Sequence, residues 1–450
     1  MSPWMTIIAA LVLALPVAWL LRAGAQALTG QAPRWRDMPL SVAYGYVVGG
    51  LILIWLINTY RQGLAAEGPD ANRYFFFMVA VNGFIAFAVL AYFFRVLGMS
   101  FGTEGSKKLF RSMPLTASFG IVIILAYAFV AMFAGQVSVT TIVVIAVIGL
   151  VISEILRQMS GDEVAVKSAA TFGVAIAIMF IMYFVGPLAP YGQEEILGAA
   201  NVVPGGNPAL GGNPEFPLGT DQIGRDILSR LIYGAQNTVG IAFATTCLAF
   251  FIGGSLGFLA ATLQGWLDQI ISRAVDVLMA IPALIFALLL MTIATVWANE
   301  FGINRTYFMV VIIAVIDSTR VYRLARAVGL NIVVMDYIEA AKLRGEGLGY
   351  LIFREILPNA TAPLLAEFGL RFCFVFLTIA SLSFLGVGIQ PPLADWGTMV
   401  KDLAQFINFA SFAPQVATAP LLAAGAIALL TVAVNFVVDW MLHKSSGLKE

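Results

Sequence analysis

Charged residues are scarce in this sequence. Of its 450 residues, 60% are hydrophobic and only 11% are charged, whereas an average soluble domain carries about 25% charged residues. A soluble fold this apolar would have too little polar surface to stay in solution, so most of the apolar surface must face lipid. Basic and acidic residues balance at 25 each, and this balance gives no indication of nucleic-acid binding.

Histidine and cysteine are nearly absent. One histidine, His443, and two cysteines in separate apolar stretches, Cys247 and Cys373, nearly exclude a Ser-His-Asp site, a zinc-hydrolase site and a disulfide framework. No stretch matches the phosphate-binding pattern GxxxxGK[ST], because GTEGSKK at 102–108 has the wrong spacing. We therefore expect no catalytic residues, no metal site and no cofactor bound by this chain, and we expect that it does not hydrolyse ATP itself.

Long apolar runs dominate instead. A helix needs about 20 apolar residues to cross a bilayer, and each span must satisfy its own backbone hydrogen bonds there. Eleven segments qualify, at roughly 4–21, 41–59, 74–95, 115–134, 138–156, 171–189, 237–262, 274–297, 306–328, 360–388 and 415–442. The first run has no basic residue before it and no clear cleavage site, so we expect a retained span. The sequence predicts an all-α integral membrane protein with about 11 transmembrane helices.

Basic residues set the expected orientation, because loops rich in lysine and arginine stay on the cytoplasmic side. With the N-terminus outside, 18 of the 25 basic residues fall inside and six fall outside. The opposite orientation would reverse this bias. We therefore expect the N-terminus outside and the C-terminus inside.

The chain divides near residue 160. An accessory N-terminal unit, residues 1–160, has about five spans and no motif with assignable chemistry. The tight link GQVS between its fourth and fifth spans suggests that these two form a helical hairpin. A polar stretch, 157–170, is expected to link it to a second unit, residues 161–450. The second unit has about six spans and two long segments between spans: 190–233, rich in Pro, Gly and Asn and expected outside, and the polar loop 329–358, expected inside.

The loop 329–358 has the pattern of two short helices joined by a glycine. Asp336 is a fair N-cap for a helix over 337–344. Gly345 suits the left-handed position that ends such a helix. A second short helix is expected over 348–356, with Pro358 restricting its end.

This loop also carries a family resemblance. Ala340 and Ala341 would leave a surface without bulky side chains, which another protein could approach closely. The spacing is similar to the EAA loop of bacterial ABC-importer permeases, a loop that docks into a cleft on the cytoplasmic ATPase. The matching positions are Glu339, Ala340, Ala341, Gly345, Glu355, Leu357 and Pro358. Peptide-type permeases usually have histidine at the position of Glu355, so the local contact there differs.

A second resemblance lies in the signature segment, residues 216–236, which reads FPLGTDQIGRDILSRLIYGAQ. It is similar to the GTDxxGRDxxSRxxYG pattern of dipeptide, oligopeptide and nickel permeases, at Gly219, Thr220, Asp221, Gly224, Arg225 and Asp226. From the residues alone it is a cluster of turn formers. We weigh a structural role, in which it shapes the external mouth, above contact with a binding protein. Residues 381–400 and the basic stretch 323–326 also resemble this family.

Ionisable residues inside spans are functional candidates by default. Glu367 and Arg371 are spaced i, i+4, and Asp317 and Arg320 are spaced i, i+3. Either the pairs neutralise each other and stabilise helix packing, or one of them lies on the substrate path. Gly253 and Gly257 form a small-xxx-small step, which is typical of close helix packing.

The resemblances cover roughly residues 170–445 and imply a six-helix type I ABC-importer permease core. Such a subunit forms half of a translocation pathway for peptides or a related small solute, in the bacterial or archaeal cytoplasmic (inner) membrane. Its implied partners are a second permease, two ATPase subunits that carry ATP and Mg, and an external substrate-binding protein. The N-terminal unit, residues 1–160, is expected to pack outside this core, which would insert without it. The alternative is a self-contained proton- or sodium-coupled secondary transporter.

Overall fold

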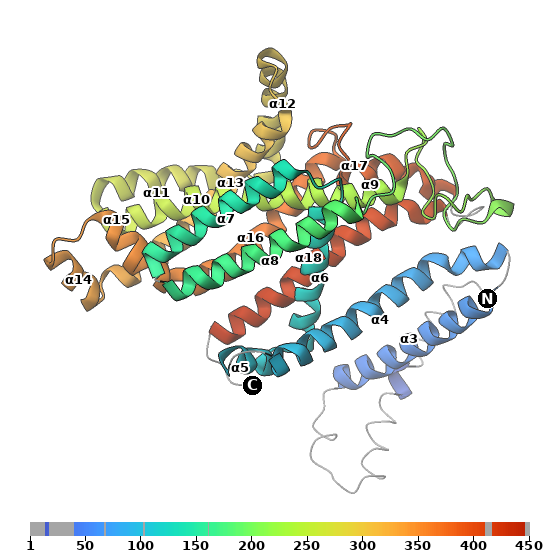
Figure 1. Cartoon of the computed structure of the whole chain (residues 1–450), viewed down its shortest axis with the longest axis horizontal. Coiled ribbons are helices and arrows are strands. Elements are labelled where there is room, and N and C mark those ends of the chain that lie inside the picture. Colours follow the sequence, from blue (N-terminus) through green and yellow to red (C-terminus); the bar gives the residue numbers. More distant parts are fainter. Residues whose placement is uncertain are drawn as a thin grey trace, which may run out of the picture. The chain divides into compact units, whose positions relative to one another are not determined.

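The computed structural model describes residues 14–17, 40–66, 69–101, 104–160, 162–409 and 416–445. These residues form helices, with only isolated β-bridges among them (Figure 1). The expected span 4–21 lies outside the described residues except for 14–17. The α-helices are α3 Leu40–Ala65, α4 Pro69–Phe101, α5 Glu104–Ser112, α6 Leu115–Phe133, α7 Val139–Ser160, α8 Asp162–Val185, α9 Ile227–Gly234, α10 Gly240–Leu263, α11 Gly265–Ala280, α12 Ala283–Phe301, α13 Arg305–Val333, α14 Asp336–Leu343, α15 Leu348–Tyr350, α16 Leu357–Phe384, α17 Trp396–Leu403 and α18 Ala419–Ser445.

Shorter helical turns join some of these elements. Two π-helices, η2 Ala235–Val239 and η3 Leu351–Ile356, connect α9 to α10 and α15 to α16. The 3-10 helices are η1 Pro208–Leu210, η4 Ala404–Phe409 and η5 Val416–Thr418. Because the π-turns keep the chain helical, 227–263 and 348–384 are two long continuous helices.

Seven helices of the described residues are long and apolar enough to cross a membrane. The all-α membrane architecture is therefore confirmed, whereas the number of eleven spans is not. The seven are Phe77–Ser100, Leu115–Phe133, Ser168–Val185, Ile227–Leu263, Ala283–Phe301, Leu348–Phe384 and Val416–Lys444.

The expected span 274–297 is wrong as a single helix. It is divided between α11 and α12, and Figure 1 shows α12 turning sharply away from α11. Ile281, between them, is extended, with φ −89° and ψ 130°. The cause is Pro282, because a proline disfavours helical backbone at the residue before it.

The expected linker 157–170 is helical in its described residues, 157–160 and 162–170. α7 runs to Ser160 and α8 begins at Asp162, and the two helices pack together. The side chains of Ser153 and Ser168 share a hydrogen bond of 3.1 Å. The stretch is polar but rich in helix-forming Ala, Glu, Lys and Gln, so it continues both helices. The expected hairpin of α6 with α7 is replaced by one of α7 with α8.

α6 packs directly against α18 of the second unit. A Cβ at Gly120 of α6 would collide with the carbonyl oxygen of Ala433 in α18. The Tyr127 hydroxyl donates to the Ala426 carbonyl of α18 at 3.0 Å. The division of the chain near residue 160 stays a prediction.

Glycines allow α10 and α13 to approach closely, as the small-xxx-small spacing predicts. A Cβ at Gly253 would collide with the Ser318 carbonyl of α13, and one at Gly257 would lie 2.7 Å from the Ala325 Cβ. The close backbone approach makes this the most extensive helix pair of the fold.

The chain forms two compact units, 1–82 and 83–450, with the boundary inside α4. In the first unit, Trp55 of α3 packs edge-to-face on Phe77 with ring centroids 6.3 Å apart, and Tyr60 donates a hydrogen bond to the side chain of Asn82 at 3.0 Å. The second unit holds all the motifs of interest. Figure 1 places α14 and α15 at one end of this unit and α9 with the signature segment at the other.

Candidate functional site

The EAA segment, residues 334–358, begins with α14. Met335 is the N-cap of α14 and makes no side-chain capping hydrogen bond. Asp336 is thus the first helical residue, and its expected role as N-cap is wrong by one position. Asp336 and Glu339 both lie in the first turn, where negative charge is favourable near the positive end of the helix dipole.

Gly345 ends α14 in the left-handed conformation predicted from the sequence. Its φ is +81°, and its N–H donates to the Lys342 carbonyl at 2.9 Å. No atom lies within 4 Å of the position of a Cβ at this residue. The backbone conformation, rather than lack of space, therefore favours glycine here.

Ala340 and Ala341 lie on different faces of α14, one exposed and one buried, so the expected surface of two alanines is wrong. Ala341 is fully buried in a cluster with Ile338, Leu351 and Ile356. Ala340 is exposed. The separation follows from helix periodicity, because Ile338 and Ala341 are three residues apart and share the inner face of α14.

Large apolar side chains are exposed in the EAA segment. Leu343 is 83% exposed, and Val334 and Phe353 are also mostly exposed. α14 and α15 lie at the end of the helix bundle (Figure 1). Several large exposed apolar side chains in one short segment favour a protein–protein contact.

The second half of the EAA segment continues into a long helix. The expected helix over 348–356 is present as α15 and η3, but it does not end at Pro358. Pro358 falls in the first turn of α16, where a missing N–H is tolerated. Leu357 packs partly buried against the same apolar cluster as Ala341. The Glu355 carbonyl accepts a hydrogen bond from the Asn359 side chain at 2.7 Å.

The signature segment forms a closed loop around a buried aspartate. Asp221 Oδ1 accepts from the N–H groups of Ile223 and Arg225, at 3.1 and 2.9 Å. Its Oδ2 accepts from Arg225 Nε at 2.7 Å and lies 3.9 Å from Arg230 Nε. Gly219 and Gly224 both have positive φ, +79° and +83°. The turn interpretation of this segment is confirmed.

Two further signature residues anchor this loop. The Val202 N–H donates to Thr220 Oγ1 at 3.0 Å, and Thr220 is buried. Asp226 is the N-cap of α9, and its Oδ2 accepts from the N–H and hydroxyl of Ser229 at 2.8 and 2.6 Å. These side chains are engaged in internal bonds, which favours the structural role over direct contact with another protein.

Sequence reasoning missed the network that joins 381–400 to η2. Asp395 is the N-cap of α17 and accepts from the Thr238 hydroxyl at 2.7 Å and from the Thr398 N–H at 2.9 Å. Asn237 donates to the Ala394 carbonyl at 2.7 Å. The burial of Asp395 raises the pKa of its carboxyl. The only local signal was an aspartate three residues before a threonine at a helix start.

The intramembrane charges form a cluster across two helices rather than two separate pairs. Arg371 Nε of α16 lies 2.7 Å from Glu367 Oε1, and its Nη1 lies 3.7 Å from Asp317 Oδ1 of α13. The Nε and Nη1 atoms meet these oxygens as ion pairs without hydrogen-bond alignment. The Glu367–Arg371 pair is therefore present, and Arg371 replaces Arg320 as the partner of Asp317.

The basic stretch 323–326 ties α13 to α11. Arg326 binds Asp268 in a two-pronged ion pair, with Nη2 2.6 Å from Oδ2. These hydrogen bonds hold the pKa of the Asp268 carboxyl below its usual value. Arg323 pairs with the exposed Asp276 at 2.6 Å.

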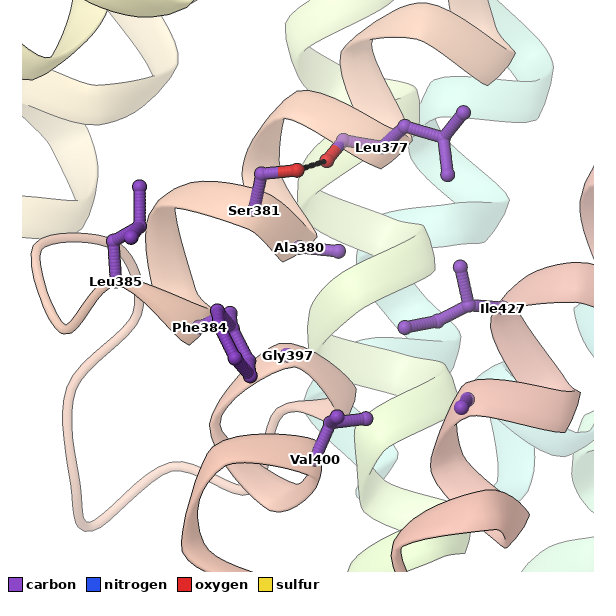
Figure 2. Close-up of a pocket in the computed structure, with 9 residues that line it drawn as sticks. Leu377, Ala380, Ser381, Phe384, Leu385, Gly397, Val400 and Ile427 are labelled. Atoms are coloured by element: carbon purple, nitrogen blue, oxygen red, sulfur yellow. Dashed lines mark hydrogen bonds between the residues drawn. The ribbon is translucent and has the colours of Figure 1, made fainter. Parts of the chain in front are cut away.

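An apolar cavity of about 380 Å³ opens between α16, α17 and α18. Figure 2 shows Leu377, Phe384 and Ile427 around it. Its one hydroxyl-bearing side chain, Ser381, donates its proton to the Leu377 carbonyl of its own helix at 2.7 Å. Across the described ranges, no three His, Cys, Asp or Glu side chains gather closely enough to hold a metal ion.

Comparisons with known proteins agree with these features. The family described as binding-protein-dependent transport system inner membrane component matches residues 253–444. The dipeptide transport system permease protein DppC of Haemophilus influenzae is 36% identical over 242 residues, which cover 53% of this chain and 78% of that protein. DppC of Escherichia coli is 37% identical over 59% of this chain and 83% of the relative.

A further relative is the glutathione transport system permease protein GsiD of Pectobacterium atrosepticum, which is 32% identical over 64% of this chain and 87% of its own length. The comparisons give no support to a self-contained secondary transporter. The chain belongs to the binding-protein-dependent transport system inner membrane components and is a permease subunit of an ABC importer.

Proposed function

We propose that this permease imports peptides or a closely related small solute and that the EAA segment is its docking site for an ATPase. The relatives named above carry dipeptides and glutathione, which supports a peptide substrate. ATP and Mg²⁺ bind to two separate ATPase subunits. A second permease completes the pathway, and an external binding protein delivers the substrate.

The exposed apolar face of the EAA segment carries the docking proposal. Ala341 fixes α14 to the bundle, while Ala340 and Leu343 point outward from the same helix. Closure of the ATPases on ATP would then move α14 and, through η3, the long helix 348–384 as one piece. The result is a two-state pathway whose equilibrium is shifted by ATP.

We assign the EAA end to the cytoplasm and the signature end to the outside, with the N-terminus outside and the C-terminus inside. The 18-to-6 distribution of basic residues supports this orientation. A cysteine placed within 198–212 should react with an impermeant thiol reagent added to sealed cells, and one at Gly347 should not. The reverse labelling would refute the orientation.

Docking is tested with Leu343→Asp. Burial of a leucine side chain contributes about 1.5–3 kcal/mol, so its loss should weaken ATPase co-purification roughly ten- to hundredfold. Leu385→Asp is the matched control, because Leu385 is an exposed helix-terminal leucine at the other end of the unit. Membrane insertion should be normal in both variants. Equal ATPase recovery from the two variants would remove the assignment.

A further inference from the structure

Midway along α13 and α16, two arginines flank one aromatic ring. The Phe374 ring centroid lies 4.6 Å from the guanidinium carbon of Arg371 and 5.8 Å from that of Arg320. Arg371 in turn contacts Glu367 and Asp317. Both helices thus contribute one acid and one arginine to the charged cluster, defined as these four residues with Phe374.

The members of the charged cluster are not equally buried. Asp317 and Arg371 are each only 7% exposed, so water screens their ion pair little. Arg320 is exposed, and among the described residues no carboxylate lies within ion-pair distance of it. Glu367 keeps 21% of its side chain exposed, and Phe374 is about half exposed. The surface therefore presents a guanidinium, a carboxylate edge and a ring.

On α16 this surface lies within a candidate membrane span, Leu348–Phe384, whereas α13, which carries several charged residues, is not among the seven candidates. α13 has 29 residues and α16 has 28, so each is about 42–44 Å long at 1.5 Å per residue, longer than a hydrocarbon core of about 30 Å. Arg320 and Arg371 are both near the middle of their helices. A charged side chain at this depth faces a bundle interior or a water-filled cavity rather than lipid.

The geometry points to a substrate-contacting surface: the α13–α16 face that carries the charged cluster lines the translocation pathway, where Arg320 binds the carboxylate and Glu367 the ammonium of a zwitterionic peptide. This assignment rests on the proposed peptide import. Phe374 offers an apolar surface to the peptide between its two charged ends. The cluster has two carboxylates and two guanidiniums, so its net charge is zero and it matches a zwitterion better than an ion of one sign.

Such a site must be weak. The pathway has to bind the solute well enough to admit it and loosely enough to release it. The single positive charge of Arg371 is shared between two carboxylates, those of Glu367 and Asp317. Arg371 therefore holds Glu367 in place, and Glu367 still attracts an ammonium group. Arg320, with no acid of its own within ion-pair distance in the described chain, is the group freest to exchange partners as the peptide passes.

Water access tests the location without relying on transport. In the assembled importer, with Cys247 and Cys373 replaced by alanine, single cysteines are placed at Phe374 and Phe251. Phe251 is 72% exposed on α10, a helix without a charged residue. An impermeant hydrophilic thiosulfonate reacts with the thiolate form of a cysteine. Apolar surroundings raise the pKa of a thiol, and each pKa unit of this rise slows labelling about tenfold. Labelling should be fast at Phe374 and slow at Phe251. Slow labelling at both positions would overturn the location.

Substrate preference tests the role of Arg320. Uptake of the dipeptide Ala-Phe is compared with uptake of its C-terminal amide by Arg320→Gln, Arg320→Lys and the control Arg323→Gln. The ratio of free-acid uptake to amide uptake should fall several-fold below that of the unsubstituted protein only in Arg320→Gln. The binding protein is the same in every variant, so its own preference does not affect this comparison. An unchanged preference in Arg320→Gln would overturn the role. If the unsubstituted importer carried no dipeptide, the proposed substrate would be wrong, and the labelling would still decide whether this face lines the pathway.

Discussion

Tyr127 of α6 stands edge-on to Trp396 of α17, with ring centroids 5.5 Å apart and an angle of 85° between the rings. Trp396 is almost fully buried, and its Nε1 donates to the Leu231 carbonyl of α9 at 2.9 Å. A Cβ at Gly234 would collide with its ring. A side chain from the N-terminal third of the chain thus completes the packing around the helix that follows the 381–395 segment.

The first prediction concerns this contact. Tyr127→Phe should lose only the hydrogen bond to Ala426, which lowers the free energy of unfolding by about 1 kcal/mol. Tyr127→Ala should cost about 3–5 kcal/mol, because it leaves a cavity beside Trp396. Thermal unfolding of the purified protein measures both.

A chain beginning at residue 104 keeps α6 and should stay monodisperse in detergent, whereas one beginning at 161 should not. Equal behaviour of the two truncated chains would show that α6 is dispensable.

A second prediction uses two adjacent glycines of α10. Gly253 lies against the Ser318 carbonyl of α13, whereas a Cβ at Gly254 meets nothing within 4 Å. Gly253→Ala should force the helices apart and cost about 1–3 kcal/mol. Gly254→Ala should be neutral or slightly stabilising, because alanine favours a helix by about 1 kcal/mol over glycine. Thermal unfolding in detergent compares the two, and equal shifts would argue against a close α10–α13 contact.

Local patterns in the sequence predicted local structure well. Gly345, Gly219 and Gly224 were expected at turns, and all three have positive φ. Their constraints are contained in a few neighbouring residues, so no knowledge of the fold was needed. The spacing of Gly253 and Gly257 likewise indicated a packing face, although it could not identify α13 as the partner.

Long-range relationships were not predictable from the same patterns. Arg320 is three residues from Asp317, yet Arg371 of another helix takes the place beside that carboxylate. Tyr127 lies in a region without motifs, and its partner Trp396 belongs to a distant helix of the chain. Which helix faces meet depends on the packing of the whole bundle, and apolar spans that face lipid carry little periodicity to reveal it.

The third prediction separates backbone strain from crowding in the EAA segment. Gly345 and Gly347 both have open space where a Cβ would lie, but only Gly345 has positive φ. Gly345→Ala should cost about 1 kcal/mol, and Gly345→Val more, because a branched residue is poorly tolerated there. Gly347→Ala is the control. Transport and ATPase coupling should fall with Gly345→Val and remain near normal with Gly347→Ala, while both insert normally. Normal coupling in Gly345→Val would show that the turn is not needed for docking.

The last prediction concerns pH and the ion pair of Asp268 with Arg326. The hydrogen bonds from Arg326 lower the pKa of Asp268 in the folded protein. The folded state therefore binds a proton here less readily than the unfolded state, whose aspartates titrate at about 3.9. The pair contributes its full stability above that value and loses it as the pH falls through the lower, folded pKa. Asp268→Asn should lower the free energy of unfolding by about 1.5–3 kcal/mol. The difference in unfolding temperature between this variant and the unsubstituted protein should stay constant from about pH 8 to pH 5.5 and shrink only below about pH 4. Asp276→Asn is the control, because the pair of Asp276 with Arg323 is about half exposed and should be worth only about 0–1 kcal/mol. A difference that already shrank between about pH 7 and pH 5.5 would contradict a lowered pKa at Asp268.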